Sequence, residues 1–182
     1  MCKKLLAMIL MTITVLSVLS GCAESHTYTE ISDYGEFYED ECVVNLSLDI
    51  FPATVDESYC NEYIYSWSRG LLDDHCQIFL DCTYDDVTFS EEKMRIQNLD
   101  GGFFLKLGEI NPAPEDEIVY DEDLLSYPAY VKSYIEGSEY EYAFVFEEEN
   151  RIVYVGLQWC PMKNVKFDHK YLPLKYKFFT HI

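Results

Sequence analysis

Cysteine is the residue type with the widest chemical scope in this chain of 182 residues, where it occurs seven times. Two of these cysteines lie near the N-terminus, and the other five are Cys42, Cys60, Cys76, Cys82 and Cys160. A thiol can form a disulfide, ligate a metal or attack an electrophile. Five thiols allow at most two intramolecular disulfides, and the sequence does not rank the possible pairings. Cys82 lies on an apolar strand face, where a buried free thiol is also a reasonable expectation.

Patterns that signal catalysis or metal binding are weak. His75 is adjacent to Cys76, but catalytic partners meet in space and not through adjacency in the chain. The histidine and cysteines at 75–82 lack the second half of a zinc site. The acidic clusters at 115–117 and 121–123 do not continue into a calcium loop. We therefore expect no metal, no cofactor and no catalytic cysteine. The 33 acidic residues leave carboxylate-based hydrolysis open without nominating a pair.

The N-terminus has the layout of an export signal. Lys3 and Lys4 precede an uncharged run from Leu5 to Leu19, which is followed by small residues. A basic start, an apolar stretch and small residues before a cut site are typical of secretory signals. As a helix the run would span roughly 22 Å, short of the hydrocarbon thickness of about 30 Å. Residues 1–21 are therefore expected to be a removable signal peptide.

The tetrapeptide Leu19-Ser20-Gly21-Cys22 resembles the lipobox of bacterial lipoproteins. The resemblance implies a diacylglyceryl group on the Cys22 thiol and cleavage between Gly21 and Cys22. Two or more acyl chains, such as palmitate, attach a protein stably to a membrane. The resemblance thus predicts a lipid-anchored protein on the extracytoplasmic face of the cell membrane. The remaining chain is similar to small bacterial lipoproteins and resembles no family of known activity.

Acidic residues dominate the composition, with 33 Asp and Glu against 13 Lys and Arg and a formal charge of -20. Loss of Lys3 and Lys4 with the signal leaves 11 basic against 33 acidic residues, a charge of -22. Nucleic-acid binding requires clustered positive charge and is not expected. An aromatic content of 16% argues against disorder. A strongly negative body would attract cationic proteins or peptides.

The elements that position these residues follow from periodicity and charge. Residues 22–41 contain seven acids and no Lys or Arg, which indicates an acidic membrane tether before a single ectodomain at 42–182. The aromatic residues of this segment, Tyr28, Tyr34, Phe37 and Tyr38, leave open that part of it docks on the domain. Alternation predicts strands at 43–51, 59–67, 76–84 and 103–110. Three later strands, at 129–135, 140–146 and 152–159, are predicted to form an antiparallel meander.

One helix is predicted between these strands. The sequence Thr88-Phe89-Ser90-Glu91 fits a capping box, and Asp100-Gly101-Gly102 would stop the helix after about Leu99. The expected fold class is α+β, an antiparallel sheet with a C-terminal meander and one main packed helix.

The aromatic strands and the C-terminal tail each have two interpretations. Alternating tyrosines favour the core of a small sheet over an exposed platform for sugars or peptides. Residues 163–182 contain five lysines and a single aspartate. We expect this tail to fold back on the acidic body as a final strand, with contact to an anionic lipid or polymer as the alternative.

These observations favour a binding or accessory module of the bacterial envelope whose ligand the sequence does not identify. Its expected partners are the membrane, through acyl chains on Cys22, and a cationic protein or a cell-wall component. An acidic inhibitor or decoy for cationic proteins is the alternative, and an envelope hydrolase that uses carboxylates is the second. The oligomeric state is left open.

Overall fold

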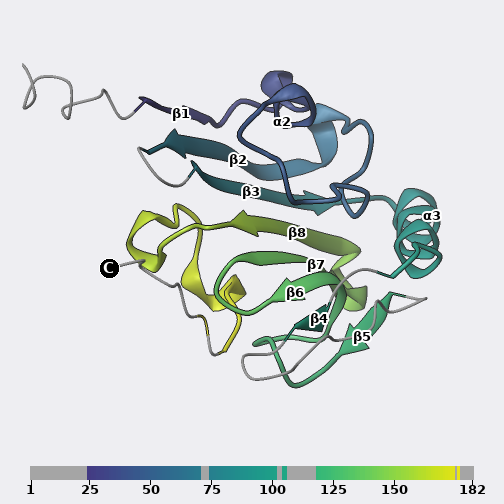
Figure 1. The fold of residues 1–182 in the computed structure, drawn as a ribbon. Helices are drawn as coiled ribbons and strands as arrows, with labels where there is room; N and C mark the ends of the chain where they lie inside the picture. Colours follow the sequence, from purple (N-terminus) through teal and green to yellow (C-terminus); the bar gives the residue numbers. More distant parts are fainter. Residues whose placement is uncertain (1–23, 71–73, 102–103, 106–117, 175, 177–182) are drawn as a thin grey trace, which may run out of the picture.

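In the part of the chain that the structure describes, the fold is built on one eight-stranded sheet (Figure 1). The computed structural model describes residues 24–70, 74–101, 104–105, 118–174 and 176. The strands are β1 (Glu24–Tyr28), β2 (Cys60–Arg69), β3 (Asp74–Thr83), β4 (Phe104–Leu105), β5 (Val119–Asp121), β6 (Ala129–Ile135), β7 (Glu139–Phe146) and β8 (Arg151–Gln158). Their spatial order is β1-β2-β3-β8-β7-β6-β4, with β5 paired to β6. All these pairs are antiparallel except that of β4 with β6.

Helical structure is limited in the described residues. The α-helices are α2 (Glu36–Glu39) and α3 (Asp86–Gln97). Short 3-10 turns are η1 (Ile31–Asp33), η2 (Glu57–Tyr59), η3 (Glu147–Glu149), η4 (Met162–Asn164) and η5 (His169–Tyr171). The prediction of an α+β domain with an antiparallel sheet and one main helix is confirmed at this coarse level.

Apolar side chains project from both faces of the sheet along its central strands. In the register of β2 and β3, Tyr65 lies opposite Ile78 and both belong to the core of the first face. The neighbouring pair, Ile64 and Phe79, belongs to the core of the second face. Strands buried on both sides carry nearly continuous apolar runs, and each face needs a cover.

The first face is covered by residues 37–51 and by α3. Phe37 and Phe51 from this covering segment and Ile96 from the helix are buried against the sheet. Gly156 of β8 makes the close approach possible, because a Cβ there would lie 3.2 Å from atoms of both Leu46 and Phe51. The Tyr-rich strands supply core and not an exposed platform: Tyr63, Tyr65, Tyr140 and Tyr142 are all buried.

The predicted strand at 43–51 is wrong. Side chains of the sheet and of α3, and not a neighbouring strand, satisfy the backbone of this segment. The buried Gln158 side chain accepts hydrogen bonds from the amides of Val44 and Asn45 at 3.1 and 3.0 Å. It also donates to the carbonyl of Cys42 at 2.9 Å. Arg95 of α3 donates to the carbonyls of Asp49 and Ile50, both at 2.6 Å.

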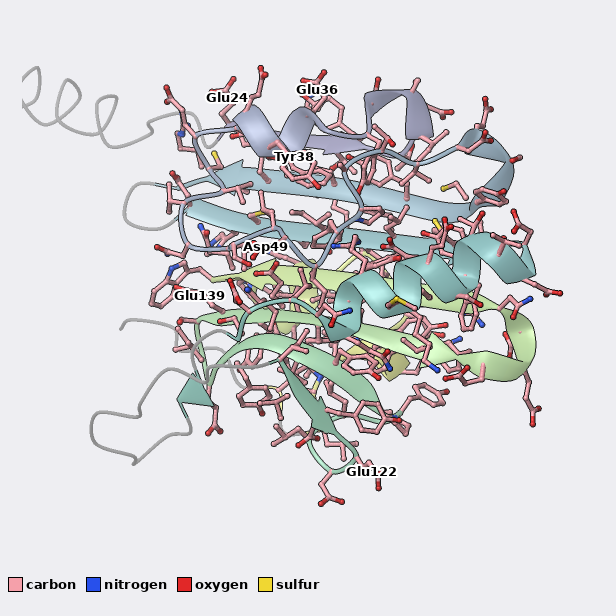
Figure 2. The ribbon with its side chains drawn as sticks, turned by 90° about the vertical axis from the view of Figure 1, so that its right-hand side faces the viewer. Glu24, Glu36, Tyr38, Asp49, Glu122 and Glu139 are labelled. Atoms are coloured by element: carbon pink, nitrogen blue, oxygen red, sulfur yellow. The ribbon has the colours of Figure 1, made fainter. Side chains whose placement is uncertain are left out.

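The expected acidic tether over residues 22–41 is not what the structure has from residue 24 onward. β1 pairs with β2 along its whole length, and Phe37 of α2 is fully buried. Tyr34 donates a hydrogen bond to the carbonyl of Pro52 at 2.6 Å. The aromatic side chains bring enough apolar surface to dock the segment, while its carboxylates stay outside. Glu24 and Glu36, for example, project outward from this margin of the molecule (Figure 2).

The second face is covered by the C-terminal segment. Phe167 stacks on Phe79 with ring centroids 4.7 Å apart, and Tyr142 donates to the carbonyl of Tyr171 at 2.6 Å. Up to Leu174 the basic tail therefore folds back on the body as expected, but as turns and coil and not as a strand. The rest of the tail, apart from Tyr176, lies outside the described residues.

The helix starts earlier than the predicted capping box. The carboxylate of Asp85 accepts hydrogen bonds from the amides of Val87 and Thr88 at 3.0 and 2.9 Å. Asp85 is thus the N-cap, and Thr88 lies in the first turn. The helix ends at Gln97 with Asn98 as its C-cap, before the expected glycine stop.

Candidate functional site

A pocket with a mixed polar and apolar lining lies where β1, β2 and β3 meet the C-terminal covering segment (residues 159–174). Its volume is about 380 Å³. The residues that line it are Ser25, Ser66, Trp67, Ser68, His75, Cys76, Gln77, Cys160, Lys163, Asn164, Val165 and Lys166. This volume is within the range of about 300–1,000 Å³ typical of small-molecule sites.

Strand register gathers the polar side chains of the pocket on the second face. Ser68 lies opposite His75, and Ser66 lies opposite Gln77. In the adjacent pair of strands, Ser25 lies opposite Ser68. Because side chains alternate along a strand, these residues share a face with Ile64 and Phe79 farther along. On this face, the apolar residues near Ile64 and Phe79 are followed along the strands by hydroxyl, amide and imidazole groups, and the pocket lies at these polar groups.

The buried side-chain amide of Gln77 holds the C-terminal covering segment against the sheet. Gln77, which is 3% exposed, donates from Nε2 to the carbonyl of Asn164 at 2.8 Å. Its Oε1 accepts from the amide of Lys166, also at 2.8 Å. The Lys166 ammonium donates to the hydroxyl of Thr27 at 2.7 Å and so reaches across to β1. The C-terminal covering segment is therefore hydrogen-bonded to β3 on one side of the pocket and to β1 on the other.

The charge of the lining is opposite to that of the chain. Lys163 and Lys166 are the charged residues that line the pocket in the described part of the chain, and none of the lining residues is acidic. The chain as a whole has 33 acidic against 13 basic residues. Serine hydroxyls can donate or accept hydrogen bonds, while lysine ammonium groups only donate. The arrangement favours an anionic ligand over a cation.

The thiols of the pocket are poor nucleophiles. Burial raises the pKa of Cys160 to about 12 and that of Cys76 well above its usual value. Both are therefore protonated at neutral pH, whereas nucleophilic attack requires the thiolate. His75 and Cys76 are adjacent in the chain, but strand alternation places them on opposite faces of the sheet. Cys76 packs in the core of the first face, and His75 lies on the second face. The His75 Nδ1 donates to the carbonyl of Trp159.

The other sequence-predicted site residues are dispersed. Cys42 and Cys82 are buried, Cys60 is half-buried, and all five described cysteines are free thiols. The structure brings Cys60 and Cys82 together, directly opposite each other on β2 and β3. Gly21 and Cys22 lie outside the described residues.

The acidic residues do not converge on this pocket. Glu141, whose pKa burial raises to about 7, is completely covered by the segment above it. Asp121 accepts hydrogen bonds from the amides of Asp123 and Leu124 and so caps its own turn. Across the described ranges, no group of three or more His, Cys, Asp or Glu side chains is placed to hold a metal ion.

Apart from His75, Cys76 and Cys160, sequence reasoning missed the residues that build this pocket. Gln77 looks like an isolated polar residue in an apolar strand, and Lys166 looks like one lysine of a basic tail. The signal that was available is the alternation of Ser66 and Ser68 on the same face as Gln77, which marks a polar end to a buried strand face.

No family model, no curated protein and no solved structure matches this chain. Within the described residues, no helix is long and apolar enough to cross a bilayer.

Proposed function

We propose that this protein is a lipid-anchored binding or accessory module on the extracytoplasmic face of a bacterial membrane, and that its pocket binds a small anionic ligand. One observation carries the choice of ligand: the lining has two lysines and no acidic residue, in a chain of charge -20. Most of the charged side chains of this protein are acidic, so a pocket lined by two lysines and no carboxylate differs from the rest of the protein. We infer that the pocket selects anionic ligands, which the other side chains of the protein repel.

The anchor rests on the N-terminal pattern alone. The lipobox Leu19-Ser20-Gly21-Cys22, in register with a basic start and an apolar run, supports acylation of Cys22. Attachment to the membrane through acyl chains would leave the domain in the extracytoplasmic space.

The hydrogen-bonding groups of the lining define the ligand class further. Lysine ammonium and serine hydroxyl groups suit the oxygen atoms of a phosphate or a carboxylate. The imidazole of His75 and the amide of Gln77 are already engaged with the backbone of the covering segment. The Ser66 hydroxyl shares a hydrogen bond of 3.1 Å with Thr27. Lys163, Ser25 and Ser68 are therefore the groups that we expect to contact the ligand first.

The test is ligand binding by the purified full-length chain in detergent. Inorganic phosphate and succinate serve as anionic probes, glucose as a neutral probe and spermidine as a cationic probe. We expect saturable binding of an anionic probe by calorimetry, and loss of that binding in the double variant Lys163→Gln, Lys166→Gln. Lys170→Gln is the matched control, because Lys170 is an exposed lysine of the same segment that does not line the pocket.

Binding of spermidine alone would contradict the proposal, as would anion binding that the double variant leaves unchanged. In that case the acidic surface becomes the better candidate. Its carboxylates lie at opposite margins of the molecule, with Glu24 and Glu36 at one and Glu122 at the other (Figure 2).

The acidic inhibitor or decoy is the second candidate, and the net charge of -20 favours it. Binding of a basic protein to such a surface depends on unscreened charge, and the Debye length is about 8 Å at physiological salt. A complex with lysozyme that persists at physiological salt, and that the lysine double variant does not weaken, would support this alternative. The envelope hydrolase has no comparable support.

A further inference from the structure

An irregularity in β2 places two cysteines opposite each other. In the pairing of β2 with β3, Glu62 lies opposite Asp81, and the next paired residue along β2 is Cys60, opposite Cys82. Asn61 is thus the extra residue of a β-bulge. In a regular ladder Asn61 would face Cys82, and Cys60 would be shifted to the other face. The bulge therefore creates the juxtaposition of the two thiols.

The Asn61 side chain holds the bulge in place from the other face of the sheet. Its amide donates to the carboxylate of Asp81 at 3.0 Å and to the hydroxyl of Thr83 at 2.8 Å. Asp81 is in turn bound by the guanidinium of Arg151, through two hydrogen bonds of 2.9 Å each. Cys60 and Cys82 both pack with the core of the first face.

Directly opposed residues of antiparallel strands suit a disulfide. Their Cα atoms are separated by about 4.5 Å or about 5.5 Å, according to the type of pair. Disulfides span Cα separations of roughly 4.4–6.8 Å, so both types of pair are within reach. Cys60 and Cys82 are such an opposed pair. We infer that Cys60 and Cys82 are a redox-active pair that closes into a cross-strand disulfide.

The two thiols differ in the way that disulfide exchange requires. Cys60 is half-buried and Cys82 fully buried. Their mutual hydrogen bond lowers the pKa of Cys60 and, together with burial, raises that of Cys82. Cys60 is therefore the accessible thiol that ionises first, and Cys82 is the one that follows it.

The reaction is exchange with a small disulfide such as oxidised glutathione. The Cys60 thiolate attacks one sulfur of that disulfide, whose S–S bond breaks, and the departing thiolate takes up a proton. Cys82 then loses its proton and attacks the Cys60 sulfur of the mixed disulfide, releasing the second glutathione as a thiol. Cys60 and Cys82 are oxidised, and one glutathione disulfide is reduced to two thiols. This inference is independent of the proposed ligand pocket.

Peptide mapping of the full-length chain tests the pairing. The protein is equilibrated with oxidised glutathione, its remaining thiols are blocked under acid quench, and it is digested with chymotrypsin. Tyr59 separates Cys42 from Cys60, and Phe79 separates Cys76 from Cys82, so the digest distinguishes the possible partners. We expect a peptide that joins Cys60 to Cys82 and a protein mass lower by two hydrogen atoms. In the reduced native protein, maleimide should modify Cys60 first among the five described cysteines.

Three variants complete the experiment. Cys60→Ser and Cys82→Ser should abolish the linked peptide, while the control Cys160→Ser, at another buried cysteine, should keep it. If a variant fails to fold, the peptide map of the wild-type protein still decides the question, because it identifies the two linked cysteines directly. A wild-type protein without this linked peptide after equilibration, or one in which Cys60 joins another cysteine, overturns the inference.

Discussion

The Glu141 carboxylate accepts hydrogen bonds from both the backbone amide and the hydroxyl of Ser47, each at 3.0 Å. This contact joins β7 to the covering segment of the first face. Glu141 is fully buried, and the nearest charged groups include Asp49, which pairs with the Lys132 ammonium at 2.9 Å. The protonation of Glu141 is therefore coupled to the packing of residues 37–51, which cover the first face of the sheet.

Stability should fall as the pH rises from about 4.5 to about 7 because of Glu141. Burial is the main cause that raises its pKa from 4.5 to about 7, and the Ser47 hydrogen bonds oppose the rise. The folded state then holds a proton that the unfolded state releases. The contribution to stability is full below pH about 4.5 and is lost by pH about 7, on the order of 3 kcal/mol.

Urea denaturation between pH 4.5 and 8 measures this effect. Glu141→Gln should flatten the pH dependence in this range. Glu139→Gln is the matched control on the same strand, where half-burial raises the pKa less strongly. A stability profile that Glu141→Gln leaves unchanged would contradict the prediction.

Gln77→Leu should loosen the cover of the pocket. The substitution removes the hydrogen bonds to the Asn164 carbonyl and the Lys166 amide and leaves both backbone groups unpaired. Such a loss destabilises by about 1–3 kcal/mol. Chemical denaturation measures the loss, and limited proteolysis should show earlier cleavage within residues 160–174.

The control for this change is Gln97→Leu, at an exposed glutamine of α3. Exposed substitutions usually change stability by less than about 0.5 kcal/mol. Equal effects of the two variants would mean that Gln77 has no special role in holding the covering segment.

Asp85→Ala should destabilise α3 more than Thr88→Ala. Asp85 accepts the hydrogen bonds that cap the helix, and these lower its pKa to about 2. The stabilisation by this carboxylate is present above the usual pKa of 3.8 and disappears as the pH falls through about 2. Melting temperatures of the two variants by circular dichroism measure the difference, and a larger loss for Thr88→Ala would restore the capping box as the start of the helix.

Cys22→Ala should release the protein from the membrane fraction. Without the thiol, no diacylglyceryl group can be attached, and cleavage by the lipoprotein signal peptidase should stop. Metabolic labelling with palmitate, followed by fractionation, measures both effects. Cys2→Ala is the control within the same segment and should retain label and location. A Cys22→Ala protein that keeps its lipid label would refute the anchor.

The strands that sequence predicted well are those in which alternation was strong. Tyr63 and Tyr65 of β2 and Tyr140 and Tyr142 of β7 lie on the expected faces, because period-two burial leaves a direct trace in the sequence. Residues 43–51 carry the same apolar content without being a strand. Their backbone partners are Gln158, Glu141 and Arg95, residues distant in sequence that no local pattern reveals.

The candidate site was less predictable for a related reason. Ser25, Gln77 and Lys163 come from three separate parts of the chain and meet only because β1 joins the sheet and the tail folds across it. Charge counting favoured a solvated N-terminal segment, while its aromatic residues left docking open. Docking prevails because Tyr34 and Phe37 contribute apolar area to the contact while their neighbours' carboxylates stay at the surface.

The pairing of β1 with β2 places Ser25 in the wall of the pocket, so the three-residue step from Cys22 would limit the distance between an acylated Cys22 and the pocket. Ser25 lines the pocket and is three residues beyond Cys22 in the chain. Since an extended chain spans about 3.5 Å per residue, an acyl anchor on Cys22 would hold this wall within about 10 Å of the bilayer surface. A long tether would have let the domain sample the surrounding medium. With this short reach, occupancy of the pocket would follow the surface density of ligands in the headgroup layer and not their bulk concentration.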